Sequence, residues 1–208
     1  MKSFFRKILQ KKDVETSHIN TSNSSQEYVE KKLIPEDIVA EWKLAAPHRD
    51  DVCVEIVEEL RGIINTDADV SSDKLSRAVQ VIHEKFDLYH LGIYIVKDGW
   101  LVLYAGAGEA IDRMLARDTK RSPEHGLIGH VATTKTIRCA WDLDPDSQIY
   151  FQGPDLGKTN SEIAMPLLWN NKIIGVIDLH SLIRCDFREE EYEIYKMMAD
   201  CVTEILIM

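Results

Sequence analysis

Three histidines and a run of aspartates are the first residues of this sequence to consider for metal chemistry. His125, His130 and His180 lie in the second half of the chain, and none stands at a metal-ligand spacing such as HxxxH. Aspartates alternate over residues 142–146, but the glycine and the distal glutamate of a calcium-binding loop are missing. We therefore predict no metal site and leave the cofactor unassigned.

The four cysteines, Cys53, Cys139, Cys185 and Cys201, are widely spaced and form no CxxC pair. No secretory signal is present, so we interpret them as reduced residues of a cytoplasmic protein. Buried cysteine packs as a small hydrophobe, and we assign each of the four to the core.

Alternation in residues 161–167 predicts a strand with two different faces. One face carries Ile163, Met165 and Leu167, and the other carries Glu162, Ala164 and Pro166. The small residues of the second face leave room for a loop or a ligand. Gly175, in the next predicted strand, indicates close approach of another element.

A long loop, residues 141–160, can close over that second face, and loops of this length in a compact domain are usually functional. Its aromatic residues can form the wall of an apolar pocket, and polar residues can anchor a ligand there. The aromatic residues are Trp141, Tyr150 and Phe151, and the polar residues are Asp142, Asn160 and Glu162.

The elements that must position these residues follow from hydrophobic periodicity. Helices are predicted from Pro35 and over 49–64, from Ser72, over 109–117 and 127–134, and over 188–208. Strands are predicted over 91–96, 100–105, 136–140, 162–168 and 172–180, with hairpin turns at Asp98-Gly99 and Asn170-Asn171. Helices at both ends thus enclose two hairpins and one further strand, which indicates an α/β (α+β) layered domain.

Residues 75–206 resemble a GAF domain, the small-molecule sensing module of signalling proteins, and the details are most similar to GAF domains of bacterial histidine kinases. Six motifs occur in the family's order and carry this resemblance. They are YAGAGE at 104–109, GLIGHVA at 126–132, DLDPD at 142–146, TNSEIAMPL at 159–167, IIGVIDL at 173–179 and FREEE at 187–191.

The resemblance implies a central antiparallel sheet of about six strands, with the terminal helices on one face and a ligand pocket under loops on the other. It also implies a homodimer, parallel or antiparallel, through helices 49–64 and 188–206. The broad apolar faces of both helices agree with a dimer, although packing within one chain explains each helix equally well. The residues expected in the pocket are Tyr104, His130, Trp141, Asp142, Tyr150, Phe151, Asn160, Glu162 and His180.

Several ligand classes known from GAF domains find no matching residues. Ile128 and Asp155 stand where the reductases of free methionine sulfoxide keep pocket cysteines, so we predict no catalytic residue and no enzyme. No cysteine lies between Ala140 and Arg184 to attach a bilin, although His180 stands where bilin-binding domains often keep a histidine. The Asn-Lys-Phe-Asp-Glu signature of cyclic-nucleotide GAF domains cannot be placed.

Charge divides the 208 residues into two segments of opposite sign. Residues 1–34 carry seven basic and four acidic side chains, whereas the remainder carries 18 basic and 31 acidic ones. We predict a basic tail and linker over 1–34 and a domain over 35–208 with its core at about 73–206. The acidic body disfavours nucleic acid as a partner.

Residues 1–12 place aromatic and aliphatic side chains on one side of a helix flanked by lysine and arginine. This pattern predicts either weak contact with the inner face of an anionic membrane or a solvated tail. No stretch is long enough to cross a bilayer.

We expect a small-molecule sensor that acts through its dimer helices on a separate signalling partner, or on an output module outside this sequence. The alternatives are a structural dimerisation module without a ligand and a methionine sulfoxide reductase. Ligand identity is not predicted.

Overall fold

The computed structural model describes residues 49–66, 71–109, 111–117, 119–141, 143, 158–184, 186–188 and 191–208. The predicted tail, the helix expected from Pro35 and most of the 141–160 loop lie outside these residues. Three of the predicted pocket residues, Asp142, Tyr150 and Phe151, also lie outside the described residues.

A six-stranded antiparallel sheet in the order β3-β2-β1-β6-β5-β4 forms the centre of the domain. Its strands are β1 (His90–Lys97), β2 (Trp100–Gly108), β3 (Lys120–Arg121), β4 (Arg138–Ala140), β5 (Ser161–Trp169) and β6 (Lys172–Ser181). The predicted antiparallel sheet is therefore confirmed. The two-residue strand β3 was not predicted, because a strand so short shows no alternation; it exists by pairing with Leu101 and Val102 of β2.

Both predicted hairpins are present, and their turns have the backbone that a two-residue connection requires. Asp98 and Gly99 have φ of 49° and 82°, and Asn170 and Asn171 have φ of 49° and 60°. Positive φ at both central residues matches the right-handed twist of the flanking strands, and asparagine, aspartate and glycine tolerate it best.

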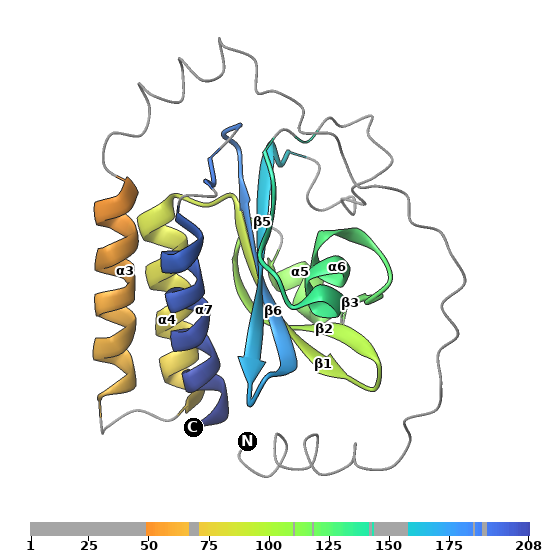
Figure 1. The fold of residues 1–208 in the computed structure, drawn as a ribbon, viewed down its shortest axis with the longest axis horizontal. Coiled ribbons are helices and arrows are strands. Elements are labelled where there is room, and N and C mark those ends of the chain that lie inside the picture. The colour runs from red at the N-terminus through yellow and green to blue at the C-terminus, as the bar shows by residue number, and fades with distance from the viewer. Residues whose placement is uncertain are drawn as a thin grey trace. The chain divides into compact units, whose positions relative to one another are not determined.

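Helices cover the two faces of the sheet unequally (Figure 1). On one face lie α4 (Ser71–Phe86) and α7 (Tyr192–Ile207), and α3 (Arg49–Ile64) packs on these two helices. On the other face lie α5 (Ile111–Ala116) and α6 (Gly126–Thr134). We refer to the two faces as the α7 face and the α6 face.

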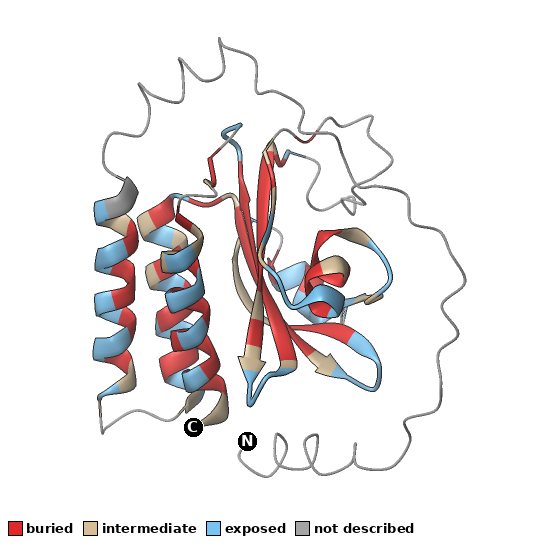
Figure 2. Cartoon of the chain, in the orientation of Figure 1, coloured by how far each residue is buried: buried red, intermediate tan, exposed pale blue. Residues whose placement is uncertain are grey.

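Strand alternation divides the apolar residues between two cores. Ile163, Met165 and Leu167 are fully buried on the α7 face, as predicted. On the α6 face, Tyr94, Ala164 and Val176 pack with side chains of α5 and α6. Figure 2 shows that most residues of the central strands are buried.

Packing within the chain uses the apolar faces that suggested a dimer. The stripe of α3 that contains Cys53, Ile56, Leu60 and Ile63 is buried, and its opposite side is exposed and mostly charged. The broad apolar surface of α7 is shared between β5 and α3. The breadth of these faces therefore requires no second subunit, and the dimer remains a prediction.

Among the described residues, no helix has the length and the apolar character needed to span a bilayer. The cytoplasmic location remains a prediction.

Gly175 provides a test of this packing. A methyl group there would collide with the main-chain carbonyl oxygen of Tyr94 on β1, so the close approach predicted at this glycine is that of the neighbouring strand. We expect Gly175→Ala to destabilise the protein by about 1–3 kcal/mol, since backbone cannot move aside cheaply. Urea unfolding followed by circular dichroism measures this difference.

Gly62, in α3, is the matched control because nothing lies within 4 Å of a methyl group placed there. We expect Gly62→Ala to stabilise the protein by about 0.5–1 kcal/mol, through the lower helix propensity of glycine. Equal effects of the two substitutions would contradict the proposed close contact.

Candidate functional site

Polar side chains gather on the α6 face where β1 and β5 begin and β6 ends. His90, His180 and Glu162 form one row across three adjacent strands, because His90 pairs with His180 and His180 pairs with Glu162. Asp178 precedes His180 by two residues and so points to the same face. We call Glu162, Asp178, His180 and His90 the buried polar cluster; their exposed fractions are 7%, 3%, 2% and 0%.

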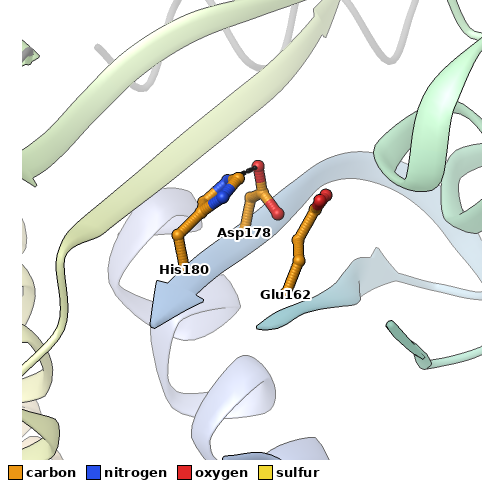
Figure 3. Close-up of side chains that lie close together, drawn as sticks. All are labelled: Glu162, Asp178 and His180. Carbon is orange, nitrogen blue, oxygen red and sulfur yellow. Dashed lines mark hydrogen bonds and ion pairs between the residues drawn. The ribbon is translucent and has the colours of Figure 1, made fainter. Parts of the chain in front are cut away.

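Direct contacts hold the ring of His180 in place. Its Nε2 lies 2.8 Å from Oδ2 of Asp178, and its Nδ1 lies 3.1 Å from the Thr159 hydroxyl. Figure 3 shows the imidazole of His180 against Asp178, with the carboxyl group of Glu162 pointing to the same side from β5. The ring of His90 meets that of His180 edge-on, with 5.3 Å between the centroids.

Some polar atoms of the cluster have no hydrogen-bond partner within the described residues. These atoms are Oδ1 of Asp178 and both ring nitrogens of His90. Buried polar atoms in folded proteins are nearly always paired, because leaving one unpaired costs about 1–3 kcal/mol. These atoms are therefore open to a hydrogen bond from a buried water or from a ligand.

Small residues flank Asp178 on the adjacent strands. Its partners on the adjacent strands are Gly92 and Ala164, neither of which has a side chain larger than a methyl group. The ring of Tyr94 reaches over Gly92, where a methyl group would lie 2.7 Å from Cε2 of Tyr94. The small residues that the sequence placed on this face thus surround a buried carboxylate.

Burial and mutual charge shift the pKa values of the cluster in different directions. Burial, followed by the charge of Asp178, raises the pKa of Glu162 to about 8. Burial and the nearby His180 lower the pKa of His90 to about 3. For His180, burial alone would lower the pKa, but Asp178 and Glu162 together raise it. These shifts favour a protonated Glu162, a neutral His90 and a charged His180 beside Asp178.

Two of the predicted pocket residues, Glu162 and His180, belong to the cluster. The side chain of Asn160 instead donates to the carbonyl of Leu182, and its main-chain carbonyl accepts from Leu143. Trp141 is half-buried directly after Ala140, the strand partner of Glu162.

Tyr104 and His130 lie away from the cluster. Tyr104 is half-buried on β2, at the irregularity where the pairing with β1 shifts. His130 lies on α6, with Nε2 3.3 Å from Nε of Arg138, and burial followed by the charge of Arg138 lowers its pKa.

Sequence reasoning missed His90, Asp178 and Thr159. The sequence did contain a signal for Asp178 and His180, because a charged residue between apolar ones in a buried strand rarely occurs without a partner. An Asp-x-His spacing also places both side chains on one face of a strand. His180 showed no metal spacing because Glu162 comes from a different strand.

The three described cysteines lie on the α7 side of the sheet. Cys139 pairs with Ile163 of the α7 face, and its Sγ lies 3.6 Å from the Phe187 carbonyl oxygen. Cys53 and Cys201 are buried in α3 and α7. Glu162 and its neighbours in the cluster lie on the opposite face.

A separate depression of about 710 Å³ lies at the same end of the sheet, beside the end of α4. Among the described residues, its lining includes neither the cluster nor a predicted pocket residue. It is formed by His83, Asp87, Leu88, Tyr89, Gly108, Glu109, Ser181, Leu182 and Ile183.

Comparison with known proteins gives a consistent fold. The family model described as GAF domain matches residues 72–204, and comparison with curated proteins gives no match. The GAF domain of a phosphoenolpyruvate-protein phosphotransferase (ptsP) from Coxiella burnetii has a TM-score of 0.64 at 20% identity, covering 74% of this chain and 92% of that one. The A. aeolicus nlh2 GAF domain, in an inactive state, has a TM-score of 0.62 at 16% identity, with 76% and 96% covered.

Enzymes are also among the similar structures. The free methionine-R-sulfoxide reductase from Neisseria meningitidis, in complex with its substrate, has a TM-score of 0.63 at 21% identity, covering 74% of this chain and 87% of that one. Further reductases share the fold. The prediction that this protein is not an enzyme is therefore wrong, because proteins with the same fold are enzymes. Identities this low show the fold alone.

The pKa of Glu162 gives a prediction about stability. Between about pH 5 and pH 8 the folded protein keeps a proton on Glu162 that the unfolded chain has released, so stability falls as the pH rises. Glu162→Gln keeps a hydrogen-bond donor and cannot ionise. We expect the melting temperature of this variant, relative to the unsubstituted protein, to increase steadily from pH 5 to pH 8.

Thermal unfolding in a pH series measures this difference, with Glu193→Gln on the exposed side of α7 as the matched control. The control should follow the unsubstituted protein at every pH. A constant difference between Glu162→Gln and the unsubstituted protein would contradict the raised pKa.

Proposed function

Because the chain belongs to the GAF domain family, we propose that it binds a small molecule at the buried polar cluster and transmits this event through its helices. One observation carries the proposal: Oδ1 of Asp178 and both ring nitrogens of His90 are buried without partners among the described residues. Such atoms are normally paired, and a ligand would pair them.

The cluster favours a ligand that combines a hydrogen-bond donor or positive group with a second polar group. The donor would meet the unpartnered carboxylate oxygen of Asp178. The second group would bond to the ring of His90, whose lowered pKa keeps it neutral. The neighbours of Asp178 on the adjacent strands, Gly92 and Ala164, are small, and apolar side chains of α6 and Tyr94 border this face. Apolar walls with a few convergent polar groups are typical of small-molecule sites.

The position of the cluster supports transmission across the sheet. Glu162 and His180 each lie next to a residue that is completely buried on the α7 face, Ile163 and Leu179 respectively. A ligand that shifts β5 or β6 would therefore change the packing of α7 against β5. Closely packed interiors transmit such shifts because they contain little free volume.

The helices would then pass the change to another molecule. We propose that α3 and α7 pair across a homodimer or contact a separate signalling partner, and that a bound ligand shifts the population of their arrangements. Support for this step comes from Val54 on α3 and Met197 on α7, which are exposed apolar side chains on the outer helices.

A thermal-shift screen tests the binding step. The probes are methionine, methionine sulfoxide, cyclic nucleotides, haem, bilins and nitrate. A probe that fits the cluster should raise the melting temperature by about 5 °C or more at a hundredfold excess over its Kd, since binding then adds about 2.7 kcal/mol. Asp178→Asn should abolish the shift.

Asp112→Asn, at an exposed position on α5, is the matched control and should keep the full shift. The proposal fails if no probe raises the melting temperature, a result that favours a purely structural dimerisation module. It also fails if Asp178→Asn responds like the unsubstituted protein. The loss of methionine sulfoxide in the presence of a thiol reductant is measured in parallel. Its catalysed reduction would identify a reductase.

A further inference from the structure

We propose that Glu162, Asp178 and His180 bind one divalent transition-metal cation. This inference rests on the proposed function, because it assigns an occupant to the same site. The cation would be held between β5 and β6 on the α6 face, and the small molecule would bind beside it or directly to it.

The three side chains converge closely enough for a single ion. One carboxylate oxygen each from Glu162 and Asp178 and one ring nitrogen of His180 all lie within 4.8 Å of one another. Two ligand atoms bound to one zinc ion at about 2.0–2.2 Å in tetrahedral geometry lie about 3.4 Å apart. Nε2 of His180 and Oδ2 of Asp178 lie 2.8 Å apart in their hydrogen bond, so a small separation of the two side chains would admit the ion. Figure 3 shows that all three side chains extend to the same side of the two strands.

The surroundings of His180 match those of a metal-binding histidine. Such a histidine usually hydrogen-bonds through its second ring nitrogen, which fixes the ring and its tautomer. Here the hydroxyl group of Thr159 lies 3.1 Å from Nδ1 and is itself buried, so Nδ1–H can donate to it. Nε2 is then the nitrogen available for a metal.

A second, independent observation points to a bound group at this place. The imidazole of His90 is completely buried beside His180, and neither of its nitrogens has a partner among the described residues. Oδ1 of Asp178 is also without one. A cation would occupy the carboxylate oxygen, and a water or anion on the cation would bond to His90.

The donor set selects the class of metal. Imidazole favours zinc, iron, cobalt and related ions, whereas calcium and magnesium prefer oxygen ligands throughout. Binding would release the proton of Glu162 and the extra proton of His180, and the charge of +2 would then balance the two carboxylates, which suits a buried site. Three protein ligands leave coordination positions open, as in zinc sites that exchange a water for a small molecule. The open positions would give the sensor its point of contact with a ligand.

The experiment uses the full chain, with any affinity tag removed and metals stripped by chelation and dialysis. Cobalt(II) is titrated in and followed by its visible absorption, and zinc(II) is titrated by calorimetry. We expect saturation at one equivalent per chain, with zinc displacing the cobalt signal.

Glu162→Gln and Thr159→Val test the assignment with little change in shape. We expect Thr159→Val to weaken zinc binding by about 10–100-fold, and Glu162→Gln to weaken it more, because a direct ligand is lost. Two controls change exposed residues: Glu193→Gln matches Glu162→Gln, and His125→Ala removes a histidine outside the cluster. Both should bind zinc as the unsubstituted protein does. Circular dichroism confirms that each variant is folded.

Two results would overturn the metal site: no binding at one equivalent by the unsubstituted protein, or zinc affinity in Glu162→Gln equal to that of the unsubstituted protein. The thermal-shift screen is repeated with EDTA present to separate this inference from the proposed function. If a probe still raises the melting temperature in EDTA and no metal binds, the metal site is refuted and the proposed function stands. If no probe raises the melting temperature and no metal binds, both the metal site and the proposed function are refuted.

Discussion

The two-residue period of β5 and β6 is the constraint on which the rest of this structure depends. Both strands are covered on both faces over most of their length, so each residue there is assigned to one of two interiors. Odd-numbered residues such as Ile163 and Leu179 pack under α7, and even-numbered residues such as Glu162 and His180 face α6. A slip by one residue would put the charged side chains into the helical core, which the cost of burying unpaired charge forbids.

Burial is therefore the reason that the cluster has unusual chemistry. In water, the carboxyl groups of Glu162 and Asp178 would both ionise at neutral pH. Inside the sheet they share a small volume with two imidazole rings, and one proton or one cation must compensate their charge. Buried ionisable groups with strongly shifted pKa values concentrate at functional sites, so this cluster is the candidate site of the domain.

Local pattern predicted most of the fold, and non-local pairing explains what it missed. The hairpins at Asp98-Gly99 and Asn170-Asn171 and the helix over 49–64 depend on residues close in sequence, and the structure contains them. Strand β3 depends on its pairing with β2, so no local signal revealed it. Glu162 and His180 were recognised separately, but the contact of His180 with His90 and the alignment of all three in one row follow from the order β1-β6-β5, which a sequence without aligned relatives does not contain.

Helix α3 buries its apolar stripe almost entirely on α4 and α7 rather than on the sheet. If α3 detached, one side of α4 and one side of α7 would become exposed, and both faces of the sheet would stay covered. The domain thus has an outer layer whose opening free energy is smaller than that of the whole, a separate cooperative unit in hydrogen exchange. An element with this independence can exchange its intramolecular partner for an equivalent helix of another chain without disturbing the α6 face.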